Sequence, residues 1–470
     1  MRSPTTIASR VARVAMIGSM FGSKSPTKIS LPSDTAPSWK VLQEQVAATA
    51  TGQRLAAEAE ARAQGAGPAH TDATLRLFGQ PESAVRVTLY RDDAAWCPYC
   101  QKVWLLLEEK EIPFEVKKIN MRSYGDKPAW FLNKVPGGLL PVMELDGQLI
   151  TESLVLMQAL DQAYPDQGPR MVPPEGTDER KRAQELLGLE RQLFSHWCAL
   201  TFQPGKGIFD ANEKRLLMTL ETVDRALGET SGPWFLGGDA PSLVDLQYVS
   251  HVERMVASLL FWKGLKIRGP TLPNLDAWLS AFEERPAYLA TKSDYYTHCM
   301  DIPPQYGPGY SIPEAAADAE SIGGGAWKLP LGPSNEPLAP LQDRGDEAAR
   351  HEAAYKLVGN AKNVARFAAR GAAPPGARPF QAPLADPSAK PNEAAVAPVD
   401  ACLRHVARAL IEGTDAAEAA AAADVAGAEG ADAVADCLAY LRDRVGVPRD
   451  MGQAAAMQLR AHLNWAIDKL

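Results

Sequence analysis

The sequence lacks the features of a membrane-spanning, disulfide-bonded or nucleic-acid-binding protein. No uninterrupted apolar run approaches the roughly 18 residues that a membrane-spanning helix requires. Six cysteines in 470 residues are too few for a disulfide framework. The formal net charge of -8 lacks the basic excess that nucleic-acid binders carry. The chain is 46% hydrophobic and 23% charged, as globular proteins are, and its length predicts two or three domains.

The first 33 residues lack acidic side chains altogether. Five lysines and arginines lie there among many serines and threonines. An acid-poor, arginine- and serine-rich N-terminus is typical of an organelle transit peptide, which we therefore expect over residues 1–35. A secretory signal would need a longer apolar stretch than Val11–Phe21, which Arg13 interrupts. A disordered tail is the other alternative.

Changes in composition divide the rest of the chain into five segments. Residues 36–70 are a helical lead-in, and residues 84–168 combine strand and helix patterns. Residues 177–300 have helical periodicity without a convincing strand, and residues 301–350 are a linker rich in proline and glycine. Residues 351–470 form a helical extension of unknown role. The predicted fold class is therefore an α/β domain followed by all-α segments.

The α/β segment has the element order of a thioredoxin-like unit. Its strands alternate apolar and polar residues, and its first helix has one apolar face. Asp146-Gly147 is a pair that favours a tight two-residue turn and so predicts a hairpin. The predicted elements are strand Val85–Tyr90, helix Pro98–Lys110, strand Phe114–Ile119, hairpin strands Leu140–Leu145 and Gln148–Ile150, and helix Glu152–Tyr164.

Three further segments carry structural predictions. The run from Trp39 to about Ala63 predicts one helix that packs on another part of the chain. In the extension, helical patterns are interrupted by a proline-rich stretch, Ala372–Pro398, and an alanine-rich stretch, Asp415–Asp436. Neither composition can form a packed core alone.

Only two of the six cysteines form a motif, Cys97 and Cys100. The others are isolated and are predicted to be small buried apolar residues; they are Cys198, Cys299, Cys402 and Cys437. A Cys-x-x-Cys motif can be half of a zinc site, a redox pair or a coincidence. Zinc would need a second pair of cysteine or histidine ligands at a suitable spacing, and the sequence has none, so no metal is expected.

The position of the motif favours redox chemistry. Pro98 suits the first position of a helix, where its missing N–H is not needed, and this makes Cys97 the N-cap residue. The sulfur of Cys97 would then face unpaired backbone N–H groups and the positive end of the helix dipole, which favour the thiolate. Cys100, one turn further along, could attack a mixed disulfide formed on Cys97.

Several separated motifs resemble one family. Residues 85–300 resemble a glutathione transferase of the cysteine type and are most similar in pattern to the omega class. The matches are spread along the segment, which makes the resemblance specific. They are Cys97-Pro98-Tyr99-Cys100-Gln101-Lys102 (also a glutaredoxin-like dithiol), Lys127-Pro128-Ala129-Trp130-Phe131, Leu140-Pro141-Val142, Glu152-Ser153, and Pro233 to Asp239 followed by Ser242-Leu243-Val244-Asp245.

The resemblance assigns five residues to glutathione. Leu140, before a cis Pro141, would pair its backbone with the extended tripeptide, as in strand addition. Glu152 would bind the α-ammonium group, Ser153 the γ-glutamyl carboxylate and Lys127 the glycyl carboxylate. Taken singly, these residues have plainer interpretations. Pro141 would be a strand-edge proline, Glu152-Ser153 an ordinary helix start and Lys127 a solvated surface lysine.

The resemblance also implies the fold and the activity. It implies a thioredoxin-like N-terminal domain and an all-helical domain in which Ser242 and Asp245 form a structural capping box. Cys97 and Cys100 become the catalytic residues of a glutathione-dependent thiol transferase or reductase, with glutathione as co-substrate. The expected reactions are dehydroascorbate reduction, deglutathionylation, and conjugation to small electrophiles, the last less suited to a cysteine centre.

Two departures from the family pattern leave alternatives open. Most cysteine-type members have one cysteine in the motif, so Cys100 favours glutaredoxin-like exchange. The chain ending, including Tyr440 to Asp450, is similar to chloroplast-targeted plant-type relatives and favours the chloroplast over the mitochondrion. The rival hypothesis is an organellar scaffold with this fold and no turnover, and a third is an iron–sulfur cluster bridging two Cys97 residues. Such cores usually dimerise, although the extension could cover the usual face.

Overall fold

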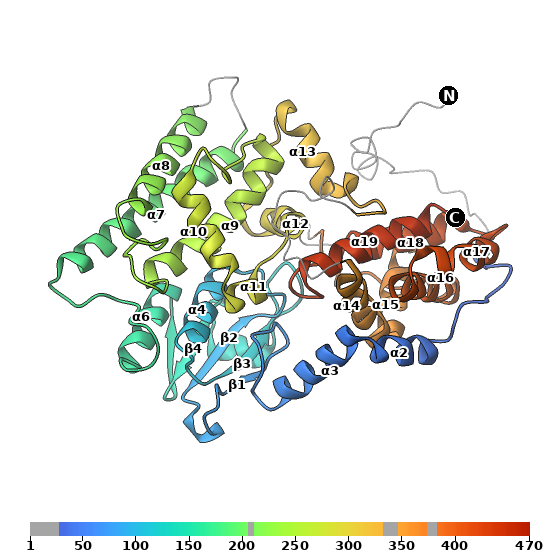
Figure 1. Cartoon of the computed structure of the whole chain (residues 1–470), viewed down its shortest axis with the longest axis horizontal. Coiled ribbons are helices and arrows are strands. Elements are labelled where there is room, and N and C mark those ends of the chain that lie inside the picture. Colours follow the sequence, from blue (N-terminus) through green and yellow to red (C-terminus); the bar gives the residue numbers. More distant parts are fainter. Residues whose placement is uncertain (1–27, 205–210, 332–345, 374–382) are drawn as a thin grey trace.

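The computed structural model describes residues 28–204, 211–331, 346–373 and 383–470, and two large hydrophobic cores organise these residues. The first core joins a mixed sheet to a helical domain, and the second joins the C-terminal helices to the N-terminal lead-in (Figure 1). Most of the predicted transit peptide over residues 1–35 lies outside the described residues.

The sheet has five strands in the order β1-β3-β2-β4-β5. Strands β2 and β3 run parallel, whereas β1 pairs with β3, β4 with β2 and β5 with β4 in antiparallel fashion. The predicted thioredoxin-like order is confirmed. Strand β1 was missed because two residues are too few to show a period. The strands are β1 Leu75–Arg76, β2 Val87–Asp92, β3 Phe114–Ile119, β4 Val142–Leu145 and β5 Gln148–Thr151.

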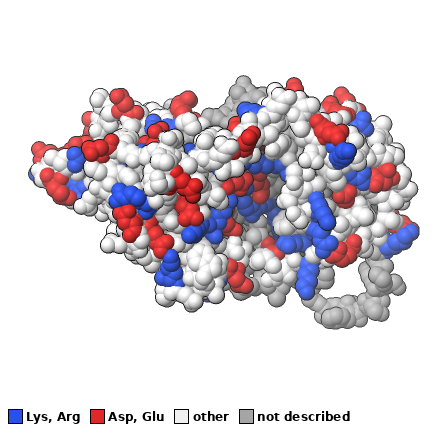
Figure 2. All heavy atoms as spheres, turned by 90° about the horizontal axis from the view of Figure 1, so that it is seen from below, with Lys and Arg blue, Asp and Glu red and all other residues white. Residues whose placement is uncertain are grey.

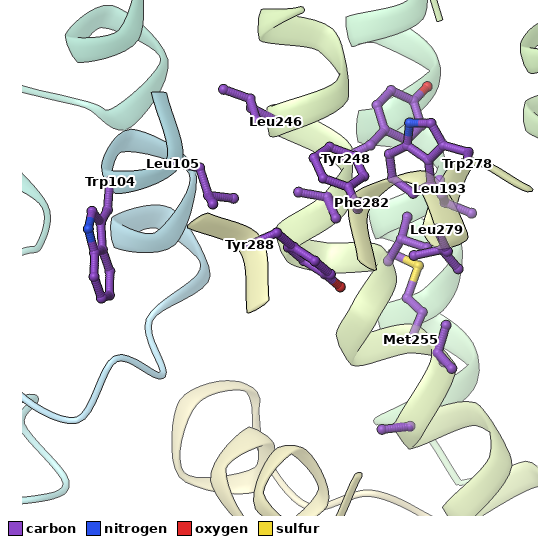
Figure 3. Close-up of a cluster of buried hydrophobic side chains, with 14 of the residues drawn as sticks. Trp104, Leu105, Leu193, Leu246, Tyr248, Met255, Trp278, Leu279, Phe282 and Tyr288 are labelled. Atoms are coloured by element: carbon purple, nitrogen blue, oxygen red, sulfur yellow. The ribbon is translucent and has the colours of Figure 1, made fainter. Parts of the chain in front are cut away.

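Helix α4 (Pro98–Glu109) is buried along almost its whole length. It is covered because it lies between the sheet and the helical domain (Figure 1). Leu105 points toward apolar side chains of that domain, whereas Trp104 points to the other side of the helix (Figure 3). The other helices of this body are α5 Ala129–Lys134, α6 Ser153–Ala163, α7 Asp178–Thr201, α8 Ala211–Leu227, α9 Leu243–Lys263, α10 Pro273–Glu283, α11 Pro286–Thr291 and α12 Tyr295–Tyr306.

The segment predicted as a linker, residues 301–350, is packed over the part that the structure describes. Helix α12 continues to Tyr306, and α13 (Ala316–Glu320) lies between short helical turns. Ile322 and Trp327 are buried, at 0% and 1% exposure. Buried apolar side chains hold this segment against the sheet and the helical domain, which together form the first body. The C-terminal helices and the N-terminal lead-in form the second body. Residues 332–345 of the predicted linker lie outside the described residues.

The lead-in consists of two helices rather than the single predicted helix. Thr49 ends α2 (Trp39–Ala48) and caps α3 (Ala50–Ala63). Gly52 permits the tight turn between them, because a Cβ at this position would lie 2.0 Å from the carbonyl oxygen of Val46. Leu42 and Val46 of α2 are buried in the second core, so this helix packs on the C-terminal extension.

The extension is helical through its alanine-rich stretch as well. Alanine has the highest helix propensity, and this stretch forms α17 and much of α18 instead of interrupting the helices as predicted. Pro398 of the proline-rich stretch lies inside α16. The helices are α14 Asp346–Gly359, α15 Ala361–Ala368, α16 Glu393–Glu412, α17 Thr414–Val425, α18 Ala431–Arg442 and α19 Gln453–Ile467.

The charge distribution, the apolarity of the helices and the burial of the isolated cysteines can be compared with what the composition predicts. Acidic and basic side chains are interspersed over the face seen in Figure 2. Across the described ranges, none of the helices combines the length and apolarity needed to span a bilayer. Of the four isolated cysteines, Cys299, Cys402 and Cys437 are buried as predicted, and Cys198 is half-buried.

Candidate active site

Strand pairing brings the predicted motifs to one end of the sheet. Val142, the first residue of β4, pairs with β2 on one side and with Thr151, the last residue of β5, on the other. Pro141 therefore lies at the same end of the sheet as Glu152. Because β4 is antiparallel to β2, this is also the end at which β2 leaves the sheet toward Cys97.

Cys97 is the N-cap residue of α4, as predicted from Pro98. Its backbone is extended (φ -73°, ψ 116°), and its carbonyl oxygen accepts the first helical hydrogen bond from Gln101 at 3.0 Å. The sulfur makes no capping hydrogen bond to the helix. Instead, the thiol points toward the carbonyl oxygen of Leu140 at 4.0 Å, and the residue is 6% exposed. The thiol therefore faces the backbone position that the resemblance assigns to glutathione.

Cys100 lies one turn inside the helix, beside a buried carboxyl group. Burial, together with the hydrogen bond and charge of Cys97, raises the pKa of Cys100 well above its ordinary value. Asp92, at the end of β2, is completely buried, and this burial raises its pKa. Its Oδ2 accepts the Trp96 backbone N–H at 2.6 Å, while its Oδ1 has no hydrogen-bond partner among the described residues.

Asp92, Cys97 and Cys100 form one compact group. Each offers one ligand atom, and the three atoms lie within 4.8 Å of one another. A metal ion could be held by two thiolates and a carboxylate of this kind. The expectation that no metal binds stays a prediction, since it considered only cysteine and histidine as partners and did not include Asp92.

Lys127 lies within electrostatic range of both thiols. Its Nζ donates to the carbonyl oxygen of Asn120 at 2.8 Å, and its side chain is half-buried. Burial lowers the pKa of Lys127, and the negative charges of Cys100 and Cys97 oppose that effect. The structure thus brings a cation to the end of the sheet that carries the motif, and its contact with glutathione stays a prediction.

Glu152 and Ser153 begin helix α6 at the edge of this site. Glu152 is exposed and has φ 69° and ψ 106°, in the left-handed half of the backbone map that residues other than glycine disfavour. A strained backbone of this kind is often found at functional sites. Ser153 is half-buried and begins the helix one residue later than predicted.

A buried polar network behind α4 was not predicted. The Lys102 Nζ donates to Gln247 Oε1 at 2.7 Å, and Gln247 in turn donates to Glu190 at 3.2 Å. Glu190 also bonds His251 Nδ1 at 2.9 Å. Burial lowers the pKa of Lys102 to about 8, an effect that Glu190 opposes, and burial lowers the pKa of His251 to about 4. The network joins the helix that carries both cysteines to α7 and α9.

Arg254 of α9 fixes the loop before Cys97. Its Nη2 donates to the carbonyl oxygen of Trp96 at 2.6 Å, and its Nη1 donates to Gln101 Oε1 at 3.0 Å. The guanidinium is buried, so these bonds are shielded from water. Trp96, the neighbour of Cys97, is therefore held at its N–H by Asp92 and at its carbonyl oxygen by Arg254.

Ser242 and Asp245 form the capping box at the start of α9. The backbone N–H and the hydroxyl of Ser242 donate to Asp245 Oδ2 at 2.8 and 2.7 Å. Asp245 Oδ1 accepts the Phe235 N–H and the Trp278 indole N–H at 3.0 and 2.9 Å. All of these contacts lie inside the helical domain, so the pair has a structural role.

Comparison with known proteins decides the family. Two family models match the chain: glutathione S-transferase, N-terminal domain, over residues 96–163, and glutathione S-transferase, C-terminal domain, over residues 206–281. The probable glutathione S-transferase DHAR1, cytosolic, of Oryza sativa subsp. japonica is 33% identical over 198 residues, which cover 42% of this chain and 84% of that protein. This chain belongs to the glutathione S-transferase family.

Further relatives agree with this assignment. Glutathione S-transferase omega-1 of Mus musculus is 32% identical to this glutathione transferase over 219 residues, 46% of this chain and 84% of that protein. Glutathione S-transferase DHAR3, chloroplastic, of Arabidopsis thaliana is 29% identical over 198 residues, 42% of this chain and 69% of that protein. The protein is thus a glutathione transferase enzyme of the cysteine-type group. Both family models end before the extension.

Proposed function

We propose that this glutathione transferase is a thiol transferase and reductase with Cys97 as its nucleophile. The observation that carries the proposal is the compact group of Asp92, Cys97 and Cys100 at the start of α4. Two thiols at this position suit disulfide exchange better than addition to an electrophile. Reduction of dehydroascorbate and deglutathionylation of proteins are therefore the proposed reactions, ahead of conjugation.

Glutathione would bind at the end of the sheet where the motifs meet. Its extended backbone would lie along Leu140, whose carbonyl oxygen faces the Cys97 thiol. Glu152 and Ser153 would take the γ-glutamyl end, through the carboxylate, the hydroxyl and the first N–H groups of α6. Lys127 would take the glycyl carboxylate. In this arrangement the glutathione sulfur would lie beside Cys97.

Deglutathionylation would then take place in balanced steps. The Cys97 thiolate attacks the glutathione sulfur of a glutathionylated protein, forming a Cys97–glutathione disulfide and releasing the protein thiolate, which takes up a proton. A glutathione thiolate then attacks this disulfide at its glutathione sulfur, giving glutathione disulfide and free Cys97 thiolate. With dehydroascorbate, two glutathione molecules supply the two electrons and two protons that yield ascorbate.

Cys100 would supply a second way to resolve the intermediate. Attack by Cys100 on Cys97 releases glutathione and leaves a Cys97–Cys100 disulfide, which two further glutathione molecules reduce. The raised pKa of Cys100 means that its thiol must lose a proton before it attacks. Asp92 would accept that proton, because its carboxyl group and the two sulfurs lie within 4.8 Å of one another and burial makes it a stronger base.

The decisive experiment compares Cys97→Ser with Cys100→Ser. Each purified variant is assayed with dehydroascorbate, with a glutathione mixed disulfide and with an aryl halide. Cys97→Ser should lose at least a hundredfold in thiol transfer, whereas Cys100→Ser should keep monothiol activity, since glutathione alone can resolve the intermediate. Equal loss in both variants would refute these roles. A wild-type protein that binds glutathione without turnover would establish the scaffold hypothesis instead.

The same proposal includes a chloroplast location. Its support is the acid-poor composition of residues 1–33 and a matched relative that is named chloroplastic. A fusion of residues 1–60 to a fluorescent protein should enter isolated chloroplasts and be shortened on import. Import without shortening, or none at all, would contradict the predicted transit peptide.

A further inference from the structure

The loop between α18 and α19, residues 443–452, contacts the catalytic loop directly. We call it the junction loop. It belongs to the second body, and the sequence assigns no function to it. Val445 and Val447 are 3% and 1% exposed, so this part of the loop is inserted between elements. It packs against Trp96, the residue immediately before Cys97.

Three contacts from the junction loop hold the indole of Trp96. Its Nε1–H donates to the carbonyl oxygen of Val447 at 3.0 Å. The Arg449 guanidinium carbon lies 4.7 Å from the ring centroid, a cation–π contact. The backbone of Gly446 approaches so closely that a Cβ added there would lie 2.5 Å from Cζ2 and 3.2 Å from Cη2 of the indole. Only glycine leaves room for the ring in this position.

The junction loop is itself fixed on its other side by the start of α12. The Val447 N–H donates to Thr297 Oγ1 at 3.0 Å, and the Ser293 hydroxyl donates to the Val447 carbonyl oxygen at 2.5 Å. The Tyr296 hydroxyl donates to the Asp443 carbonyl oxygen at 2.8 Å. Val447 is therefore tied to the helical domain by both of its backbone polar groups while it receives the indole.

Arg449 is also held in place before it contacts the ring. Its Nη2 donates to the Arg444 carbonyl oxygen at 2.6 Å and to Asp450 Oδ2 at 2.7 Å. Its Nη1 donates to the Leu384 carbonyl oxygen at 3.3 Å. These partners all lie in the C-terminal extension, residues 351–470, so the position of the guanidinium over Trp96 is set by the extension.

Trp96 is therefore fixed by two bodies of the molecule. The first body holds its backbone, through Asp92 at the N–H and Arg254 at the carbonyl oxygen. The extension holds its side chain through the indole N–H and one face of the ring, and the ring also packs edge-on against Tyr124 of the first body, with 5.1 Å between ring centroids. A residue held only at its N–H and its carbonyl oxygen can still rotate about the line that joins these two groups, and the anchored indole prevents this. The next atoms along the chain are those of Cys97, whose sulfur position depends on this rotation.

We propose that the junction loop is a positioning element of the catalytic centre: Gly446, Val447 and Arg449 set the orientation of Trp96 and thereby the position of the Cys97 sulfur. The inference rests on the proposed function only in that the chemistry being positioned is that of the Cys97 thiol. The contacts of Gly446, Val447 and Arg449 are with Trp96, so their role is positioning and not catalysis. A small displacement of a reacting group can lower a rate by up to about a hundredfold.

The test uses the full-length protein and two substitutions. Gly446→Ala puts a methyl group against the indole, and Trp96→Phe keeps an aromatic ring but removes the N–H that bonds Val447. The control is Gly359→Ala in α14 of the same extension, where an added Cβ has no neighbour within 4 Å. Two rates are measured for each: kcat for thiol transfer, and alkylation of Cys97 by iodoacetamide in a Cys100→Ser background.

The proposal predicts a loss in rate without a loss in glutathione binding. Gly446→Ala and Trp96→Phe should lower both rates by roughly 10- to 100-fold. The KM and the calorimetric Kd for glutathione should stay within about twofold, because the residues assigned to glutathione lie on other segments. Gly359→Ala should leave both rates unchanged. A general loosening of the fold would instead weaken glutathione binding and lower both rates together.

A rescue experiment tests whether the effect passes through the indole. Phenylalanine lacks the Cζ2 and Cη2 atoms that the new methyl group would meet. The double variant Gly446→Ala/Trp96→Phe should therefore be no slower than Trp96→Phe alone. Additive losses would overturn the proposed route.

The outcomes separate this inference from the proposed function. Rates within twofold of wild type in both single variants, with a lower unfolding temperature, would make the junction loop a structural contact only. If Gly446→Ala does not fold, Trp96→Phe decides the question alone. If the wild type turns over none of the thiol substrates, the proposed function fails, and the alkylation rates still test the positioning role.

Discussion

The buried ion pair between Asp294 and Arg460 joins the extension to the transferase core, and removing one partner alone should be costly. Arg460 of α19 is fully buried, and Asp294, the N-cap of α12, is 4% exposed. Asp294 Oδ1 accepts the Thr297 N–H at 2.9 Å, and Oδ2 bonds Arg460. Burial by itself disfavours the Asp294 carboxylate. The charge and hydrogen bond of Arg460 nonetheless hold the pKa of this group below its ordinary value.

Replacing Asp294 with asparagine removes the charge and keeps the cap. Asparagine caps helices about as well as aspartate, so the lost term is the ionic one. Arg460 would stay buried without its counter-charge, which typically costs about 3–5 kcal/mol. The free energy of unfolding, measured by urea denaturation, should fall by that amount. The double variant Asp294→Asn/Arg460→Met should recover most of it, because neither charge is then left unpaired.

The matched control breaks an exposed pair that also joins distant segments. Lys28 and Glu429 are 2.7 Å apart, with side chains 76% and 55% exposed. Glu429→Gln should cost far less than Asp294→Asn, since water screens this exposed pair. If Asp294→Asn costs no more than the control, the reasoning from burial is refuted.

The dependence on pH has a definite sign. A folded pKa below the unfolded value of about 3.9 means that the Asp294–Arg460 contribution is fully present above that pH. It is lost as pH falls through the lower folded value. The stability difference between wild type and Asp294→Asn should therefore be constant from pH 5 to 8 and shrink below about pH 4.

Two further predictions concern the glutathione site and the second body. Glu152→Ala and Ser153→Ala should each raise the KM for glutathione by roughly tenfold and leave kcat nearly unchanged, since each removes one charge-assisted hydrogen bond. A fall in kcat at unchanged KM would show that these residues act in the chemistry. Asp424 accepts hydrogen bonds from the Thr35 N–H at 2.6 Å and from His405 at 2.8 Å, and such bonds outweigh burial and lower its pKa to about 2. Its contribution to stability is therefore present above about pH 4 and lost as pH falls toward 2. Asp424→Asn should flatten the acid limb of a stability–pH curve over that interval, and an unchanged limb would contradict the assignment.

The predictions that hold depend on signals that are local in the sequence. Pro98 alone indicates where α4 begins, and Cys97 is indeed its N-cap residue. Alternation of apolar and polar side chains over six residues predicts a strand at Phe114–Ile119, and β3 has these bounds. The Asp-Gly pair locates the β4–β5 hairpin. Each signal arises because one residue type suits one backbone geometry, so no knowledge of the tertiary structure is needed.

The features that were missed depend on residues far apart in the chain. The Trp96 indole and the Val447 carbonyl oxygen are separated by 351 positions, and neither residue is unusual in its own segment. Asp92 ends a strand in the ordinary way, and only the fold shows that one of its oxygens is buried beside two sulfurs. Lys102 follows the helical pattern of a surface residue, yet it is 2% exposed because α9 covers it.

The composition of the second core also determines how the extension can be tested. Leu42 and Val46 of the lead-in are buried with Leu403 and Val406 of α16, and the Trp39 indole donates to Asp400 at 2.8 Å. A chain cut before α14 would therefore expose the apolar face of α2 as well as the indole of Trp96. Loss of activity in such a truncated protein would not separate misfolding from a misplaced nucleophile. Because Gly446→Ala adds a single methyl group at the one contact in question, it isolates the effect of the extension on Cys97.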